Sequence, residues 1–177
     1  GALFDSLSVA ENVAYRLNED GVDAAEIDDR VREALHFVEL EEVIDKMPAE
    51  LSGGMRRRVS IARALVSRPP VVLYDSPTAG LDPVTAQTII TLILRLRDAQ
   101  GVTALLATHR LQDAFGLANY RFDAESERVV RATAGAALGN GHALTNFLVL
   151  RDGSVYFEGD PQSVLQSSDG YLKRFLV

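Results

Sequence analysis

The stretch from Leu51 to Leu65 contains the residues best suited to binding an anion. Ser52 can serve as the N-cap of a helix, because its side-chain oxygen can accept an amide hydrogen of the first turn. Gly53 and Gly54 follow, and neither has a side chain that would keep a ligand from the amides. A helix N-terminus with bare N–H groups binds anions, phosphate most often. These residues predict a phosphate site, although an isolated Ser-Gly-Gly also fits a loop before an ordinary amphipathic helix.

Two short apolar runs farther along the chain each lead to a residue that could do chemistry. Val71–Tyr74 is followed by Asp75, and Val102–Ala107 is followed by Thr108 and His109. Such continuous runs are typical of strands buried on both faces of a parallel sheet. Asp75 then stands at the carboxyl end of a strand, where doubly wound sheets bind their ligands. Taken alone, an Asp or a His after an apolar run is more often structural.

Taken in this order, the motifs resemble the nucleotide-binding domain of ATP-binding-cassette (ABC) transporters. Leu51–Met55 is similar to the family signature, Val71–Asp75 to its Walker B strand, Ala79–Asp82 to its D-loop and His109 to its switch histidine. The resemblance covers about residues 1–120 well and the rest more loosely.

The resemblance implies ATP and Mg²⁺ as cofactors and a second ABC ATPase subunit as partner. Asp75 would hold Mg²⁺ through water, and His109 would contact the γ-phosphate and help to position the attacking water. The D-loop would cross to the opposite subunit. The implied nucleotide-binding residues are Ser52, Gly53, Gly54, Met55 and Asp82.

Parts of a complete ATPase site are missing from the sequence. It contains no Gly-x-x-x-x-Gly-Lys-Ser/Thr, and its only lysines, Lys46 and Lys173, stand in other contexts. In the family this loop and the Q-loop glutamine lie upstream of the position of Gly1. We therefore expect an N-terminally truncated domain that is inactive by itself.

Ser76 occupies the position at which the family usually has a catalytic glutamate. Serine is not a base at neutral pH, and loss of a general base costs about 10²–10⁴ in rate. Either hydrolysis is slow, or His109 and the backbone carry more of it, or a partner subunit supplies an intact site.

Capped helices surround these motifs. Ser8–Glu11 is a capping box before a helix near Val9–Leu17, and Asp23–Glu26 is a second one before a helix with a single apolar face. That apolar face consists of Ile27, Val31, Leu35 and Val38. A further short helix is expected around Glu41–Lys46. In the family, helices at this place form a helical subdomain that meets the membrane-spanning permease.

Between the strands, Asp82-Pro83 predicts the start of a helix that stops near Gly101. Its inward residues are Ile89, Ile90, Ile93, Leu94 and Leu96. The signature helix should bury Val59, Ala62, Leu65 and Val66. Its arginines, Arg56–Arg58 and Arg63, could attract phosphate, but a solvated helix face is the simpler interpretation.

The C-terminal part is less regular. A helix is expected from Leu111 to Ala118, and residues 121–146 indicate an irregular insert, a loop or a hairpin. Phe147–Leu150 and Ser154–Gly159 predict a β-hairpin around an Asp-Gly turn. Asp160-Pro161 should cap a last helix. We assign no ligand or catalytic role to His36 or His142.

A strand, a helix and a strand in succession predict an α/β fold with a right-handed crossover. We expect residues 1–177 to form a single partial ABC ATPase domain with a P-loop NTPase-type parallel sheet flanked by helices, lacking the N-terminal strands and P-loop. Residues of about 1–58 would form the helical subdomain and signature. Residues of about 59–177 would form the rest of the α/β core and the C-terminal hairpin.

Composition excludes several classes of function. The 18 basic and 25 acidic residues give a net charge of −7, so no basic excess favours nucleic acid. There is no cysteine, and no apolar run is long enough for direct membrane insertion. The resemblance implies a cytoplasmic location, peripheral on the inner face of the cell membrane through the permease.

The Leu-Ser-Gly-Gly-Met signature followed by arginines, together with the opening Gly1–Leu7, is most similar to Mla-type lipid and organic-solvent-resistance transporters. This implies the ATP-binding subunit of a bacterial ABC transporter for lipid or another apolar cargo. Two alternatives stay open. Ser76 would suit a nucleotide-sensing or regulatory ABC subunit with little turnover. A non-transport ABC ATPase of DNA repair or translation is disfavoured by the acidic charge.

Overall fold

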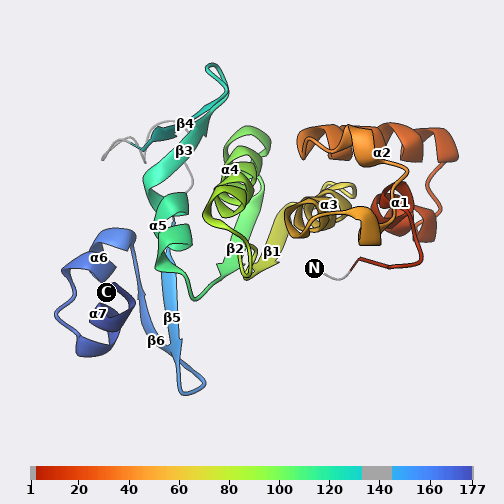
Figure 1. Cartoon of the computed structure of the whole chain (residues 1–177). Coiled ribbons are helices and arrows are strands. Elements are labelled where there is room, and N and C mark those ends of the chain that lie inside the picture. The colour runs from red at the N-terminus through yellow and green to blue at the C-terminus, as the bar shows by residue number, and fades with distance from the viewer. Residues whose placement is uncertain (1–2, 133–144, 177) are drawn as a thin grey trace.

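The computed structural model describes residues 3–132 and 145–176 (Figure 1). Three helices form its N-terminal part: α1 (Val9–Glu19), α2 (Ala24–Phe37) and α3 (Gly53–Leu65), with two 3₁₀ turns, η1 (Glu41–Val43) and η2 (Pro48–Glu50), between α2 and α3. The middle part contains β1 (Val71–Asp75), α4 (Pro83–Gln100), β2 (Thr103–Ala107) and α5 (Leu111–Asn119). Two hairpins follow, β3 (Tyr120–Asp123) with β4 (Arg128–Arg131), and β5 (Phe147–Arg151) with β6 (Ser154–Gly159). Helices α6 (Pro161–Gln166) and α7 (Gly170–Leu176) come last.

The predicted caps set the starts of the N-terminal helices. Ser8 and Glu11 form the capping box of α1, with the Glu11 amide 3.2 Å from the Ser8 hydroxyl and the Ser8 amide 2.7 Å from the Glu11 carboxylate. Asp23 caps α2 by accepting the Ala25 amide at 2.9 Å. The second capping box is wrong, however, because the Glu26 carboxylate pairs with Arg30 one turn later, at 3.1 Å.

Helix α3 packs against α1 and α2, and the predicted stripe of Val59, Ala62, Leu65 and Val66 is buried. Its arginines are less solvated than the sequence suggested for most of them, since Arg56 is exposed but Arg57, Arg58 and Arg63 are half-buried. Arg56 donates to the Leu51 carbonyl, and Arg58 donates to the carbonyl of Val38 at 2.8 Å, just beyond the end of α2. The Arg63 guanidinium lies 4.3 Å from the centre of the Phe4 ring. These side chains join elements of the helical part to one another.

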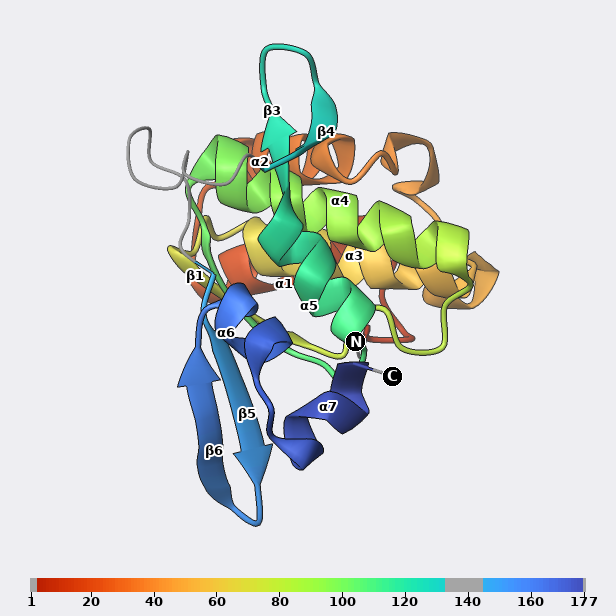
Figure 2. The ribbon, with the colours of Figure 1, turned by 90° about the vertical axis from the view of Figure 1, so that its left-hand side faces the viewer.

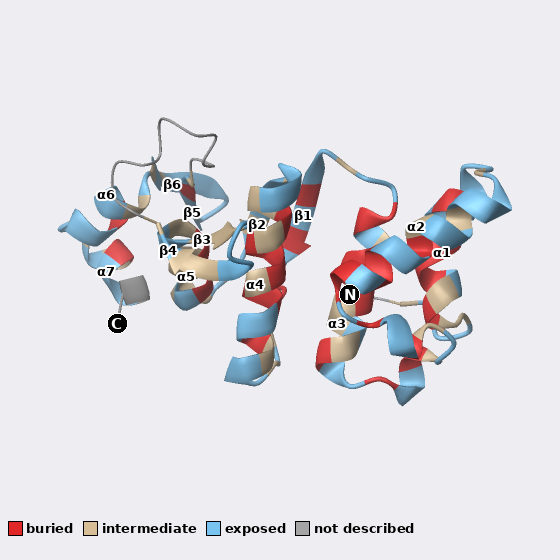
Figure 3. Ribbon diagram, turned by 90° about the horizontal axis from the view of Figure 1, so that it is seen from above, coloured by how far each residue is buried: buried red, intermediate tan, exposed pale blue. Residues whose placement is uncertain are grey.

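The two central strands are parallel, as predicted. Val71 pairs with Thr103 and the register runs to Asp75 beside Ala107, so both strands end at the same sheet edge. Helix α4 makes the crossover between them, starting after Asp82 and ending at Gly101. All five of its predicted inward residues are buried (Figure 3). This arrangement confirms the expected α/β core.

One prediction about these strands is wrong. They were expected to be buried on both faces, but Val71, Leu73 and Leu105 are 51%, 72% and 58% exposed. Val72 and Tyr74 point to the other face and join the core with residues of α3 and α4. Burial raises the pKa of the Tyr74 hydroxyl to about 12. The described helices therefore cover one face of this two-stranded sheet.

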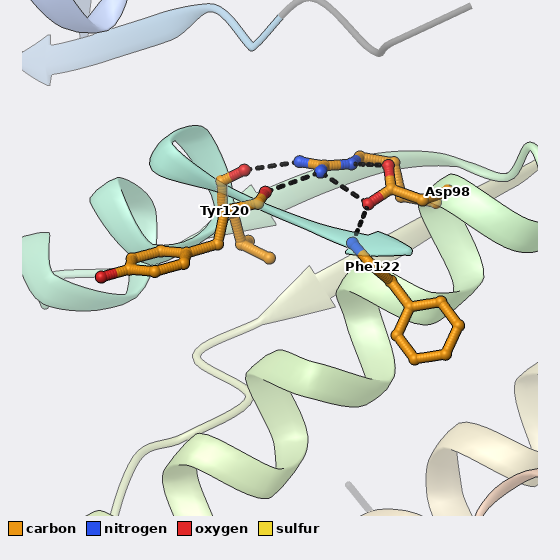
Figure 4. Close-up of polar contacts among 5 residues, drawn as sticks. Asp98, Tyr120 and Phe122 are labelled. Carbon is orange, nitrogen blue, oxygen red and sulfur yellow. Dashed lines mark hydrogen bonds and ion pairs between the residues drawn. The ribbon is translucent and has the colours of Figure 1, made fainter. Parts of the chain in front are cut away.

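A nearly buried ion pair attaches the first hairpin to α4 (Figure 4). Arg97 Nε lies 2.7 Å from Asp98 Oδ1, and each side chain is 13% exposed. Arg97 also donates to the carbonyl of Tyr120 at 2.9 Å, and the Phe122 amide donates to Asp98 at 2.7 Å. Because Arg97 also donates to the carbonyl of Leu117, the end of α5 is fixed on α4 as well.

The predicted insert at residues 121–146 is in part this hairpin, while residues 133–144, His142 among them, lie outside the described residues. The C-terminal hairpin of β5 and β6 is antiparallel, as expected. Asp160 caps α6 by accepting the Ser163 amide at 2.8 Å. Helix α7 follows it and was not predicted. Within residues 3–132 and 145–176, no helix is long and apolar enough to span a bilayer.

Candidate functional site

The predicted phosphate-binding segment is the N-terminus of α3. Ser52 is its N-cap, and the Ser52 hydroxyl accepts the Met55 amide at 3.2 Å. The Met55 amide is therefore used within the helix, and the Met55 side chain packs against the core. The first-turn amides of Gly53 and Gly54 have no acceptor within a helix of this geometry. Ser52 and Gly53 are exposed, so the start of α3 offers the Gly53 amide to an anion, whereas Gly54 is buried.

The N-terminus of α4 lies directly beside the N-terminus of α3. Figure 2 shows α4 in front of α3, and Gly54 is buried where the start of α3 lies against Thr85 of α4. A Cβ atom on Gly54 would come well within 3.0 Å of the Thr85 methyl carbon, closer than real Cβ atoms approach other atoms. A Cβ atom on Gly53 would be 3.9 Å from Leu81, an ordinary contact. Gly54 is therefore required by packing, whereas Gly53 is free to serve a ligand.

Asp82 caps α4 at this junction. Its carboxylate accepts the amides of Val84 and Thr85, both at 3.0 Å, and the hydroxyl of Thr85. These hydrogen bonds, that of the Thr85 hydroxyl above all, lower the pKa of Asp82 below its ordinary value of 3.8. The structure therefore brings Asp82 next to Gly54 through Thr85.

Asp75, Ser76 and His109 form a second group at the carboxyl edge of the parallel strands. The Ser76 hydroxyl donates to Asp75 Oδ1 at 3.1 Å, and the Ser76 amide donates to the Ala107 carbonyl at 2.8 Å. His109 follows two residues after Ala107 and is exposed, as is Asp75. Ser76 adopts a φ of +45°, a left-handed conformation that is uncommon for serine. The segment from Ser76 to Asp82 connects this group to the helix N-termini.

A buried polar junction that the sequence did not point to lies behind this segment. Thr78 is 1% exposed and Asp113 4% exposed, and the Thr78 hydroxyl donates to the Asp113 carboxylate. Arg110 Nε lies 3.8 Å from the same carboxylate. In the sequence Asp113 is an acidic residue near the start of a predicted helix and belongs to no motif. Its spacing of four residues from His109 is the one sequence signal that could have indicated it.

The edge residues fit a magnesium ion that is shared with a phosphate ligand. The described residues contain no cluster of three His, Cys, Asp or Glu side chains that could hold a metal by themselves. Asp75 Oδ1 and Ser76 Oγ do place two oxygen donors next to each other. Mg²⁺ prefers oxygen ligands and is commonly bound by one or two carboxylates together with substrate phosphates and water.

Comparison with known proteins shows which family of proteins this arrangement is similar to. Residues 1–79 match the family model described as ABC transporter. The dimeric structure of MJ0796, a bacterial ABC transporter cassette, is similar to this chain, with 29% sequence identity and a TM-score of 0.66. The similar region covers 89% of this chain and 58% of the MJ0796 chain. The same cassette bound to ADP and Pi matches with a TM-score of 0.64. Residues 1–79 thus match an ABC transporter family model, and the described fold is similar to that of an ABC transporter cassette.

Curated relatives of this chain are import proteins by name. The methionine import ATP-binding protein MetN of Xanthomonas euvesicatoria is 45% identical over 109 residues, 62% of this chain and 32% of the relative. The spermidine/putrescine import ATP-binding protein PotA of Pseudomonas aeruginosa is 42% identical over 118 residues, 67% of this chain and 32% of the relative. The chain thus spans about a third of the length of these relatives.

Replacing Gly54 with alanine should separate the two helix N-termini. Overpacking of this kind costs about 1–3 kcal/mol, which denaturant unfolding would measure. Gly53→Ala, one residue earlier, should be neutral or slightly stabilising, because its Cβ has room and alanine favours helix.

The partner substitution Thr85→Ser removes the obstructing methyl and keeps the hydroxyl that bonds Asp82. It should restore most of the stability lost in Gly54→Ala, because the next Thr85 atom is 3.7 Å from the new Cβ. Equal losses in the single and double variants would contradict the contact.

The Asp82 cap should make stability depend on pH. Its folded-state pKa is lowered, so the charged carboxylate stabilises the fold at pH values above 3.8, and this contribution is lost as the pH falls through the lowered value. We expect the stability difference between wild type and Asp82→Asn to be constant near neutral pH and to shrink below about pH 4. Urea unfolding of both proteins across that range measures it, and a difference independent of pH down to about pH 2 would show that the charge contributes nothing.

Proposed function

We propose that this chain belongs to the ATP-binding subunit of an ABC transporter, which couples binding and hydrolysis of Mg-ATP to transport through a membrane-spanning permease. The observation that carries the proposal is the contact of Gly54 with Thr85, which holds the start of α3 against the start of α4. The family match to residues 1–79 supports it.

In this proposal the exposed start of α3 binds the γ-phosphate of an ATP molecule held by a second subunit. Ser52, Gly53 and Gly54 provide the hydroxyl and amide groups, and the positive end of the helix dipole favours the anion. Met55 keeps the helix start in place, and Asp82 would meet the opposite subunit. A dimer is supported by MJ0796, whose cassette structure is dimeric.

The strand-edge group would act on the γ-phosphate of the nucleotide bound to its own subunit. Asp75, with the Ser76 hydroxyl beside it, would hold Mg²⁺, which when bound neutralises phosphate charge. His109 would hydrogen-bond the γ-phosphate and orient the attacking water. Because Ser76 cannot take up a proton at neutral pH, hydrolysis depends on positioning and is slow.

The cargo implied by the sequence resemblance, a lipid, has no support among the relatives. Those reported above are named for methionine and for spermidine and putrescine. We therefore propose a transport ATPase without assigning a lipid cargo. Its place would be the inner face of the membrane, through the permease, as expected for such a subunit.

A second candidate, favoured by Ser76, is a regulatory ABC subunit that binds ATP with little turnover. Position 76, directly after β1, carries a hydroxyl that donates to Asp75 and has no carboxylate that could act as a base. The two candidates share ATP binding and differ in whether turnover drives transport.

Nucleotide binding and turnover of the full-length protein that contains this chain test both candidates. We expect binding of Mg-ATP in calorimetry and slow hydrolysis in a phosphate-release assay. Ser76→Glu should raise turnover at least about tenfold, because it restores a general base. The matched control Thr88→Glu adds the same charge to an exposed position on α4 and should change nothing.

Failure to bind Mg-ATP would contradict the proposed function itself. Binding with equal turnover in wild type and Ser76→Glu would show that serine is no handicap at this position. Turnover that rises only in Ser76→Glu, from an undetectable wild-type rate, would favour the regulatory subunit.

A further inference from the structure

The geometry points to Asp113 as a positioning residue that, through Thr78 and Arg110, holds the Ser76–Asp82 segment against the loop that carries His109. The inference deepens the proposed function and depends on it. It concerns side chains that touch neither nucleotide nor metal and act on the residues that do.

The contact at the centre of this junction is buried. Asp113 lies in the first turn of α5, and its side chain is 5% exposed. The Thr78 hydroxyl donates to the Asp113 carboxylate, and Thr78 is 1% exposed. A buried carboxylate that loses a partner carries a large desolvation penalty, so this contact strongly disfavours separation of the two segments.

Arg110 connects the same junction to the backbone on both sides of His109. Its guanidinium lies 3.8 Å from the Asp113 carboxylate and donates to the Thr78 carbonyl at 3.4 Å. Its amide donates to the Thr108 hydroxyl at 3.0 Å. His109 lies between Thr108 and Arg110 in the chain, so this turn fixes the direction in which its backbone leaves β2.

Thr78 in turn fixes the segment that begins at the strand edge. The Leu81 amide donates to the Thr78 carbonyl at 3.2 Å, and the Ala79 amide donates to the Ser76 carbonyl at 3.0 Å. The segment is thereby folded into consecutive turns between Asp75 and Asp82. Its end reaches the start of α3 through Thr85.

A continuous set of contacts therefore joins the two groups of candidate site residues. It runs from Gly54 through Thr85 and Asp82 to the segment at Thr78, and from there through Asp113 and Arg110 to His109. Because α5 is also fixed at its far end by Arg97, Asp113 has a rigid support. Loss of the junction would move His109 relative to Asp75 without removing any group that binds ATP.

The test is Thr78→Val in the full-length protein, a change that keeps the shape of the side chain and removes its hydroxyl. We expect kcat for ATP hydrolysis to fall by about tenfold or more, since small misplacements of reacting groups reduce rates by such factors. The Kd for a non-hydrolysable Mg-ATP analogue should stay within about threefold. Asp113→Asn, which keeps an acceptor for Thr78 and loses the charge facing Arg110, should lower kcat by less.

Two further variants separate positioning from folding. Thr78→Ser keeps the hydroxyl and should return kcat to within about threefold of wild type. Thr88→Val removes a hydroxyl from an exposed threonine of α4 and should have no effect. A kcat in Thr78→Val that equals wild type, or a loss that Thr78→Ser shares, would overturn the inference. If Thr78→Val does not fold, Asp113→Asn is the deciding variant, and a kcat equal to that of wild type in Asp113→Asn would overturn the inference. Absence of Mg-ATP hydrolysis in wild type would instead contradict the transport ATPase and favour the regulatory subunit.

Discussion

The contact between Gly54 and Thr85 is the constraint on which the candidate site depends. A Cβ atom at position 54 would collide with the Thr85 methyl carbon, so the glycine allows the starts of α3 and α4 to lie against each other. The dipoles of two helix N-termini then point to the same place, where Asp82 accepts the first amides of α4 and the start of α3 keeps the exposed Gly53 amide. The Ser76–Asp82 segment ends here, at the start of α4, so a fixed length of chain joins the sheet edge to the two helix starts.

That fixed length gives the Ser76–Asp82 segment its importance. Its start pairs with the end of β2 through the Ser76 amide, its middle is held by Asp113, and its end caps α4. The segment cannot shift at one point without disturbing the others. A domain built in this way would transmit a displacement at the α3 start to His109, which is the behaviour required of a site that closes around a nucleotide from two sides.

Local rules explain how much of this fold was predictable. Ser8, Ser52, Asp82 and Asp160 were recognisable as caps because their side chains bond amides within three residues. The parallel pair β1 and β2 followed from two apolar runs separated by a capped helix. For the same reason Asp75 and His109 follow the paired strands at one sheet edge, and their roles stay proposals.

The remaining features depended on contacts between distant segments. The apolar runs predicted that both faces of the strands are buried, yet Leu73 is exposed. A strand face is buried only when another element packs on it, and an apolar run does not show whether such an element exists. Arg58 was expected in solvent and instead bonds carbonyls beyond α2, 19 and 20 residues away. Asp113 carries no local pattern, since its partner Thr78 is 35 residues distant. Helix α7 was missed because its seven residues are too few for a clear apolar period.

The central claim is that the bare amides at the start of α3 bind the terminal phosphate of a nucleotide. Amide hydrogen exchange of the full-length protein, followed by mass spectrometry with and without a non-hydrolysable Mg-ATP analogue, measures this directly. The account predicts that peptides containing Gly53 and Gly54 exchange more slowly with the analogue present, whereas exposed peptides around Asp152 do not change. Saturating analogue that leaves exchange at Gly53 and Gly54 unaltered would contradict it.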